Sequence, residues 1–229
     1  MNGRLAAVTL VLLVASAAVP TTAGAAGAES DSALTVDLTR EGDTELTLTL
    51  AYDLTSDEER EAFATLRDDA EARTRTTATF RSRMESVAGS AANATGRSMT
   101  VSGASSAFRT TDGGDTGVVV LSVNWTAFAA VDGDRLTVTE PFASGFEPDR
   151  RFVVEAPDGY AVASATPAPS ASDDGRASWA AGSSLSGFEL VAAGDDAGDG
   201  STGDGAGFGS LLALAALAGA ALLARRHGP

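Results

Sequence analysis

The stretch ALTVDLTREGDTELTLTLAYDLTSDEER, residues 33–60, decides the fold class. In two of its parts, apolar residues alternate with polar ones: Leu34, Val36 and Leu38, and then Leu46, Leu48, Leu50, Tyr52 and Leu54. Alternation with a period of two predicts β-strands that bury one face. The sequence Arg-Glu-Gly-Asp at 40–43 separates the two parts and has the composition of a hairpin turn. The stretch therefore predicts two strands paired through a tight turn.

A helix is predicted directly after the second strand. Ser56 can cap it, Glu59 lies three residues further on as in a capping box, and acids fill the first turn. From Phe63 onwards apolar residues step by three and four, which predicts one long helix over residues 57–91. The apolar stripe is weakened over 74–79, where a kink is expected. This interruption favours a helix packed on the sheet over a coiled coil or a partner-binding helix.

The following part of the chain, up to residue 193, predicts short strands. They are expected at 98–102, 105–110, 118–125, 135–140, 152–155, 160–166 and 188–191. The apolar run at 118–121 is typical of a strand buried on both faces, and 167–175 is expected to be a loop. We therefore expect an α+β domain over residues 33–193, with an antiparallel sheet or sandwich and one long helix packed on it.

Composition excludes several kinds of chemistry. The chain of 229 residues has no Cys, and its one His is His227, so neither disulfides nor the usual zinc sites are expected. All 16 basic residues are Arg, against 31 acids. Such an acidic surface repels nucleic-acid phosphates, so we expect no nucleic-acid partner. The acidity fits either adaptation to high salt or a cation-binding surface, and the scattered acids favour adaptation to salt.

No catalytic constellation is predicted. A Ser nucleophile needs a base, and residues 5–224 contain neither His nor Lys. Carboxylate chemistry stays open, with the visible pairs at 68–69 and 173–174. Neighbours on a helix point about 100° apart, and the second pair falls in a predicted loop. Both pairs are therefore expected to be solvated charges, and we expect no enzyme activity, no cofactor and no metal site.

Two sites of N-glycosylation are predicted. The sequences Asn-Ala-Thr from Asn93 and Asn-Trp-Thr from Asn124 are acceptor sequons, and the only other Asn is Asn2. Asn93 is expected just past the helix, in an accessible place, whereas Asn124 falls within a predicted strand. The protein is therefore predicted to be a glycoprotein.

Residues 1–28 are predicted to be a secretory signal. Arg4 gives a positive start and an apolar stretch follows over 5–19. The small residues leading to Ala25 and to Ala28 offer cleavage positions. An uncleaved anchor is the alternative, and the short apolar stretch favours cleavage.

The C-terminal segments predict attachment to a membrane. Residues 194–205 are mostly Gly and Asp, which is typical of a flexible spacer. Residues 206–224 carry no charge and are long enough for one helix to cross the hydrocarbon core. Arg225 and Arg226 follow at once, and such residues prefer the cytoplasmic side. The domain is therefore predicted outside the cell and the tail 225–229 inside.

The same segment resembles a known sorting signal. Gly207-Phe208-Gly209, then an Ala/Leu-rich stretch, then Arg225-Arg226 is similar to the PGF-CTERM signal of haloarchaeal surface proteins. The resemblance implies a salt-loving archaeon as the source. It also implies that an archaeosortase is a partner, which removes the tail so that a lipid takes over as the anchor. The order of the predicted strands and helix is also loosely similar to haloarchaeal surface domains of unassigned function.

Residue 206 leaves two modes of attachment open. Ala206 stands where the family has Pro. In one mode the tail is removed and a lipid holds the protein, and in the other the apolar segment stays as a single membrane span. Both modes predict a protein on the extracellular face of the cell membrane. We expect a structural or interaction role at the cell envelope with a partner not identified by the sequence, or, as the alternative, a tethered module that binds a ligand or cation.

Overall fold

The computed structural model of this chain describes residues 32–194, and the strands and helices within them fill most of this range. The first half contains β1 (Ala33–Leu38), β2 (Thr44–Asp53), α2 (Asp57–Asp68), α3 (Ala70–Thr95), β3 (Thr100–Thr111), the 3₁₀ turn η1 (Asp112–Gly114) and β4 (Thr116–Thr126). The second half contains β5 (Ala130–Asp132), β6 (Arg135–Val138), β7 (Arg151–Glu155), β8 (Tyr160–Thr166), β9 (Ala171–Asp173), β10 (Arg176–Trp179) and β11 (Glu189–Gly194).

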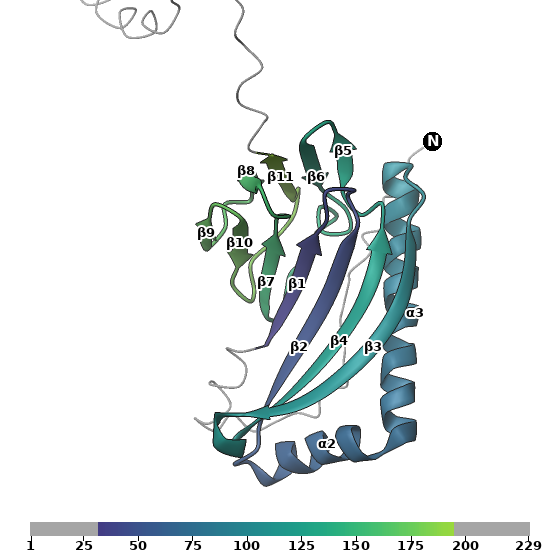
Figure 1. Cartoon of the computed structure of the whole chain (residues 1–229), viewed down its shortest axis with the longest axis vertical. Helices are drawn as coiled ribbons and strands as arrows, with labels where there is room; N and C mark the ends of the chain where they lie inside the picture. The colour runs from purple at the N-terminus through teal and green to yellow at the C-terminus, as the bar shows by residue number, and fades with distance from the viewer. Residues whose placement is uncertain (1–31, 195–229) are drawn as a thin grey trace, which may run out of the picture. The chain divides into compact units, whose positions relative to one another are not determined.

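The strands form two sheets (Figure 1). One has seven strands in the order β3-β4-β2-β1-β7-β10-β9, and the other has four in the order β5-β6-β11-β8. Within the described residues, every strand pair is antiparallel except β1 with β7. The predicted α+β class with antiparallel sheets is therefore confirmed.

The hairpin of β1 and β2 forms as the sequence predicts. Val36 pairs with Leu46 and Leu34 with Leu48, and all four side chains are buried. Gly42 in the turn has a φ of +81°, and a Cβ there would lie 2.6 Å from Cγ2 of Val131. Only Gly fits this turn, because it tolerates positive φ and has no side chain to clash.

The core lies between the two sheets and under the helices. The buried faces of β1, β2, β4 and β7 contribute aliphatic side chains, and residues after β6 add an aromatic cluster: Phe142, Phe146, Phe152, Trp179 and Phe188. The rings of Phe142 and Phe152 are 4.5 Å apart between centroids, at 55° to one another. Tilted and edge-on contacts of this kind are favourable beyond the area they bury, so this cluster fastens the second half of the domain to the first.

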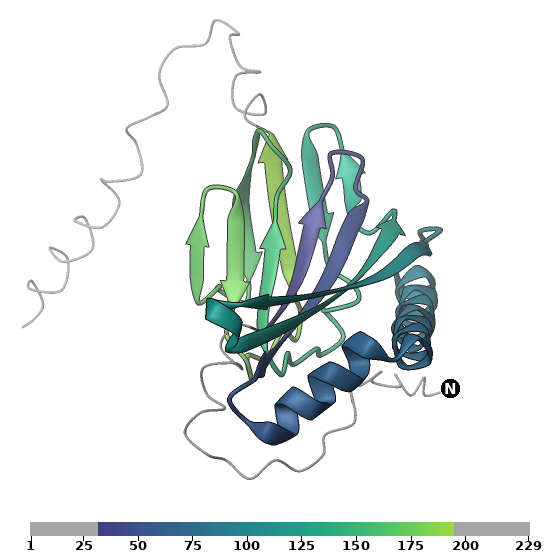
Figure 2. The same ribbon diagram turned by 60° about the horizontal axis from the view of Figure 1, so that its bottom comes forward.

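The predicted single helix over 57–91 is wrong, because two helices occupy this region. Asp69 has extended backbone (φ −88°, ψ 109°), and its carboxylate accepts from the backbone N–H of Glu71 at 2.8 Å and of Ala72 at 3.2 Å. An Asp that caps the second helix in this way ends the first. As a result α2 turns away from α3 and runs across the lower end of the large sheet (Figures 1 and 2).

The second helix continues through the region where a kink was expected. It runs unbroken over 74–79 and ends at Gly96, which has a φ of +73°. A left-handed Gly after the last turn is a common helix end. Phe80, Met84 and Val87 lie on the buried face of α3, which packs on β3 and β4.

Four further local predictions change. Ser56 begins α2 without a side-chain cap, and Glu59 accepts from the N–H of Asp53 at 2.7 Å instead of completing a capping box. The segments 98–102 and 105–110 belong to one strand, β3, which has a register shift between them. The segment 167–175 is not wholly a loop, because β9 lies within it, and β10 follows it unpredicted. In the apolar run at 118–121, Val120 is only half-buried.

The two ends of the described domain carry different elements. In Figure 1, β11 reaches the upper end, where the chain leaves towards the C-terminus, while α2 and the first half of α3 lie at the lower end. No helix within residues 32–194 is both long and apolar enough to cross a bilayer. The predicted signal and sorting helix fall outside the described residues.

Candidate interaction surface

The positive charge of this acidic chain is concentrated in α3 and β3. Residues 72–111 hold six Arg and one acid, Glu85, whereas the other described residues hold seven Arg and 24 acids. We call the six the basic strip: Arg73, Arg75, Arg81, Arg83, Arg97 and Arg109. A local excess of one sign attracts partners of the other, so the basic strip is a candidate interaction surface.

A groove of about 500 Å³ lies between α3 and β3. Its walls are Arg73, Thr74, Thr77, Ala78 and Arg81 from the helix and Ala104, Ser105 and Ser106 from the strand. The acids of α3 are Glu71 and Glu85, and neither lines this groove. The groove therefore presents two guanidinium groups above a strand of small, uncharged side chains.

The two Arg residues of the groove are only partly engaged within the domain. Arg81 donates from Nε to Oε1 of Glu85 at 2.7 Å, and Arg73 donates from Nη1 to the carbonyl of Arg67. A guanidinium has five N–H donors, so each retains donors for a ligand. The hydroxyls of Thr74 and Thr77 instead donate to backbone carbonyls of the preceding turn, at 2.8 and 2.9 Å.

Arg97 differs from the other members of the basic strip because its donors are used internally. It donates from Nε to the carbonyl of Ala127 at 3.0 Å and from Nη2 to that of Phe128 at 2.7 Å. Burial lowers the pKa of its guanidinium. Ala127 has a positive φ of 54°, so Arg97 holds an unusual turn after β4 and its role is structural.

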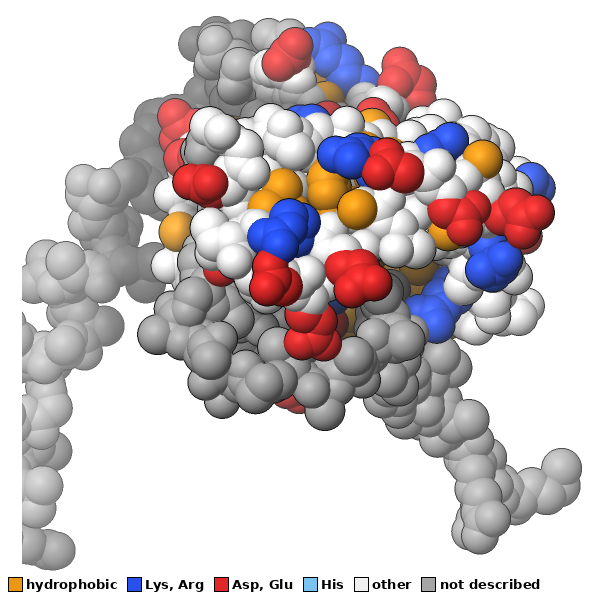
Figure 3. Space-filling model, turned by 90° about the horizontal axis from the view of Figure 1, so that it is seen from below, with side chains coloured by type: hydrophobic (Ala, Val, Ile, Leu, Met, Phe, Trp, Pro, Cys, Tyr) orange, Lys and Arg blue, Asp and Glu red, His pale blue; other side chains and the backbone are white. Residues whose placement is uncertain are grey.

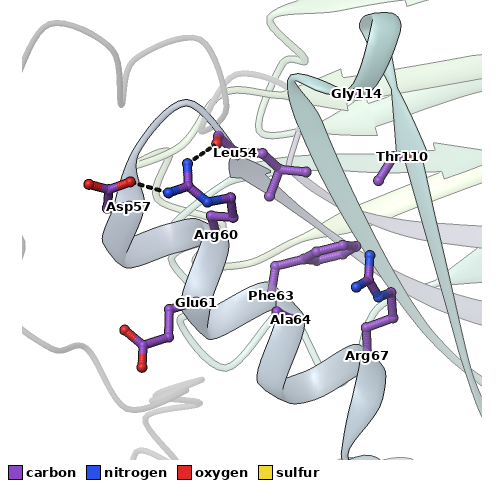
Figure 4. Close-up of a pocket in the computed structure, with 9 residues that line it drawn as sticks. All are labelled: Leu54, Asp57, Arg60, Glu61, Phe63, Ala64, Arg67, Thr110 and Gly114. Atoms are coloured by element: carbon purple, nitrogen blue, oxygen red, sulfur yellow. Dashed lines mark hydrogen bonds and ion pairs between the residues drawn. The ribbon is translucent and has the colours of Figure 1, made fainter.

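A second hollow, of about 630 Å³, lies between α2 and the β3–β4 hairpin (Figure 4). Phe63 forms its floor and is 1% exposed. Its ring contacts those of Tyr52 and Phe108 at centroid distances of 5.9 and 6.4 Å, and the guanidinium of Arg67 lies 5.6 Å above it. The floor of the hollow is thus a cluster of packed aromatic rings, with a cation–π contact from Arg67.

The rim of this hollow is charged. Arg60 donates to the carbonyl of Leu54 at 3.1 Å and pairs with Asp57, while Glu61 points away from the ring (Figure 4). Seen from below, the same end of the molecule shows apolar side chains surrounded by both Arg and acidic side chains (Figure 3). Both hollows are open to the surface, which suits contact with another molecule more than enclosure of a small substrate.

A row of carboxylates crosses the large sheet on the face opposite the core. Asp37 on β1 pairs in register with Glu45 on β2 and with Glu155 on β7. Burial raises the pKa of Asp37, and the charges of Glu155, Glu45 and Asp158 raise it further. Arg176 lies 3.4 Å from Glu155 and neutralises part of the row. Within residues 32–194, no group of three or more acids or His has the arrangement of a metal site.

The predicted carboxylate pairs are not brought together as reacting groups. Asp69 is the cap of α3, and Asp68 is exposed and bonded to Arg67, which lowers the pKa of its carboxyl. Asp173 and Asp174 are both exposed, in β9 and the turn after it. Their side chains lie where water solvates them.

Both predicted glycosylation residues have exposed side chains. Asn93 lies in the last turn of α3, not just past the helix as expected. Asn124 lies on β4 and points to the open face of the sheet, because its neighbours Val123 and Trp125 point into the core. A Cβ on Gly103 would lie 2.7 Å from Nδ2 of Asn124, so this side chain rests on a glycine of the adjacent strand.

A family model for a domain of unknown function, DUF7345, matches residues 35–160, which is more than half of the chain. The chain belongs to the DUF7345 family. The match contains both helices, the basic strip and the groove. The folded DUF7345 domain continues beyond the match to Gly194, and Trp179, Leu185 and Phe188 complete its core. No curated protein sequence matches the chain.

The PGF-CTERM motif matches residues 205–227, which confirms the resemblance noted in the sequence. The motif indicates archaeosortase processing and attachment to the membrane, so this DUF7345 protein is a membrane-anchored protein of the cell surface. The predicted sorting residues Gly207, Phe208, Gly209, Arg225 and Arg226 fall inside the match. They lie outside the described residues, as do Ala25 and Ala28 of the predicted signal cleavage region.

Sequence reasoning missed the basic strip. A count of charge over the whole chain gives only its net acidity, with 31 acids and 16 Arg, and does not show where the Arg residues gather. A count over a window of 40 residues would have found the Arg excess at 72–111. No count could have found the groove, because it depends on how α3 lies against β3.

Proposed function

We propose that this DUF7345 protein is a non-enzymatic interaction module of the cell envelope, with its domain outside the cell and its C-terminal segment as the attachment. The match to the PGF-CTERM motif over residues 205–227 carries this proposal, since it gives the surface location. The basic strip and the two open hollows support an interaction role. They offer charge and shape to a macromolecule and carry no nucleophile with an adjacent base.

The location is tested with a thiol introduced at an exposed position. The chain has no Cys, so Thr79→Cys on the exposed side of α3 provides its only thiol. A membrane-impermeant maleimide should label this variant on intact cells as completely as after lysis. Labelling only after lysis would contradict an extracellular domain.

The interaction role is tested on the protein extracted from native membranes. In a mild detergent, we expect the protein to migrate with other envelope components, at a size above that of its own micelle-bound monomer. Migration as a monomer that contains only this chain would count against the role.

We also propose that Asn93 and Asn124 are glycosylated. Both side chains are exposed and both head sequons. Intact mass spectrometry should show two glycan increments in the native protein, one after Asn93→Gln or Asn124→Gln, and none in the double variant. A native mass without sugar increments would end this proposal.

A ligand- or cation-binding module is the second candidate. The carboxylate row of Glu45, Asp37 and Glu155 favours diffuse attraction of a cation over a coordinated metal site, because partial burial and then the neighbouring negative charges raise the pKa of Asp37, while no acids within residues 32–194 are arranged as a metal site. A bound cation would relieve this repulsion. Binding to the folded state raises the melting temperature, so millimolar Ca²⁺ should raise it more in the native protein than in Asp37→Asn. An equal rise in both would exclude this row as the site.

A further inference from the structure

We propose that the groove between α3 and β3 binds an extended, acidic segment of another envelope protein. The proposal deepens the interaction role and rests on it. It names the site within the domain, the chemistry of the partner and the way in which the partner binds.

Charge selects the kind of partner. The groove lies within the basic strip, and its two charged wall residues are Arg73 and Arg81, while Glu85 and Asp68 are the acids that interact with them. Two copies of this chain meeting groove to groove would bring like charges together, which costs energy. A segment rich in carboxylates instead gains charge-assisted hydrogen bonds from the free donors of Arg73 and Arg81.

The strand beneath the groove is open to pairing. β3 is the terminal strand of the seven-stranded sheet, so one of its edges has no neighbouring strand. Residues 98–108 contain neither a charged side chain nor Pro, two of the usual guards of an exposed edge, and their one irregularity is the register shift between Ser102 and Ser105. An extended peptide can add to such an edge through backbone hydrogen bonds. Ala104, Ser105 and Ser106 lie both on this strand and in the groove wall.

The spacing of the two Arg residues sets the spacing of the partner's acids. Arg73 and Arg81 are eight residues apart on one helix, or about 12 Å along its axis. Side chains four residues apart in an extended chain lie on one face and are about 13 Å apart. The preferred segment therefore carries two acids at positions i and i+4, separated by small or β-branched residues.

The test uses the full-length protein purified from membranes in detergent and a fluorescent peptide, Thr-Asp-Thr-Val-Thr-Asp-Thr. Binding is followed by fluorescence anisotropy. We expect Arg73→Gln with Arg81→Gln to weaken binding by about tenfold or more, corresponding to the loss of two charge-assisted contacts. Arg135→Gln with Arg151→Gln removes the same charge from exposed sites outside the basic strip and the groove walls and should change the affinity less than about twofold.

Two altered peptides separate ion pairing from strand addition. Moving the second Asp one position towards the first places the two carboxylates on opposite faces, and N-methylation removes backbone donors. Both changes should weaken binding. Equal binding of the unmodified and N-methylated peptides would overturn strand addition. If the groove variant and the control variant lost the same affinity for the peptide, the groove would not be the site.

Two further results bear on the choice of partner. Binding of vesicles with anionic lipid by the native protein, without binding of any acidic peptide, would overturn the proposal in favour of a membrane surface. A failure of the proposed surface location can be distinguished from a failure of the groove proposal. The location is tested by maleimide labelling of Thr79→Cys on intact cells, whereas the groove is tested by peptide affinity.

Discussion

Asp37 shows how the sheet sets the charge state of one residue. Its carboxyl is a cross-strand neighbour of Glu45 on one side and Glu155 on the other. Burial first, and then these charges, raise its pKa, so the folded protein keeps the proton to a higher pH than the unfolded chain does. The stability that this proton provides is lost as the pH rises through the folded-state pKa.

Neutralising Asp37 should therefore stabilise the protein at neutral pH. We expect Asp37→Asn to raise the free energy of unfolding at pH 7 by on the order of 0.5 kcal/mol, the scale of a like-charged cross-strand pair. The gain should shrink as the pH is lowered, because the native carboxyl is then protonated. Urea denaturation between pH 4 and 7 measures this.

The matched control for this prediction is Asp132→Asn. Asp132 is exposed and its cross-strand neighbour is Arg135 instead of an acid, so its neutralisation relieves no repulsion of this kind. A loss of stability in Asp37→Asn at pH 7, or a gain of equal size in the control, would contradict the prediction.

Gly117 on β4 gives a prediction about packing. A Cβ at this position would lie 2.8 Å from Cδ2 and 2.9 Å from Cγ of Phe63, and 3.0 Å from Cδ2 of Leu54. Because Phe63 is buried, Gly117→Ala must displace its ring, and we expect a loss of about 1–3 kcal/mol in unfolding free energy.

Gly89 in α3 is the control for Gly117, because nothing lies within 4 Å of a Cβ built there. Gly89→Ala should stabilise by about 0.5–1 kcal/mol through helix propensity. Chemical denaturation of both variants tests the pair, and equal effects would mean that Phe63 does not restrict Gly117.

At the scale of elements, the join between α2 and α3 depends on one side chain. Asp69 accepts from two N–H groups of the first turn of α3. Removing a cap of this kind costs about 1 kcal/mol. Asp69→Ala should therefore lower the free energy of unfolding by that amount, measured by urea denaturation with circular dichroism.

The neighbouring acid separates capping from charge. Asp68 is exposed and its ion pair is with Arg67 on the same surface. Solvent screens exposed pairs, so they contribute little to stability, and Asp68→Ala should have the smaller effect. If Asp68→Ala were the more destabilising of the two, the capping role of Asp69 would be wrong.

Helix α3 and strand β3 together form a groove that neither element forms alone. The helix supplies Arg73 and Arg81, and the strand supplies an edge without charged side chains. The groove exists because the two elements lie side by side while only the buried face of α3 packs on the sheet.

At the scale of the whole molecule, the attachment is the feature to measure. We expect the intact mass of the protein from native membranes to lack the C-terminal tail, from near residue 207 to residue 229, and to include a lipid, because the motif indicates archaeosortase processing. Ala206→Pro restores the Pro of the motif and should be processed at least as completely. A native mass that retains residues 225–229 would mean that the apolar segment itself is the anchor.

The order of folded parts along the chain also bears on truncation of the domain. The family match ends at residue 160, yet Trp179 and Phe188 belong to the aromatic core. A protein cut at the end of the match would lose nearly all of β8 and the whole of β9, β10 and β11 together with these rings. The domain must therefore be kept through Gly194 in any functional study.

The sequence alone determined what local patterns encode. Alternating apolar residues and a Gly-containing turn predicted the β1–β2 hairpin, because its register depends on neighbours a few residues apart. The α+β class follows from the same periodicities, and the resemblance to a sorting signal predicted the surface location without any fold. The sequons were also visible as short local patterns.

The tertiary structure decided what depends on distant residues. The break at Asp69 arises where capping of α3 and the turn of α2 across the end of the sheet outweigh helical periodicity. The raised pKa of Asp37 needs β1 beside β7, strands that are far apart in the sequence. The groove needs α3 held against β3. Each feature comes from a contact between segments, and periodicity along one segment does not specify which other segment will lie beside it.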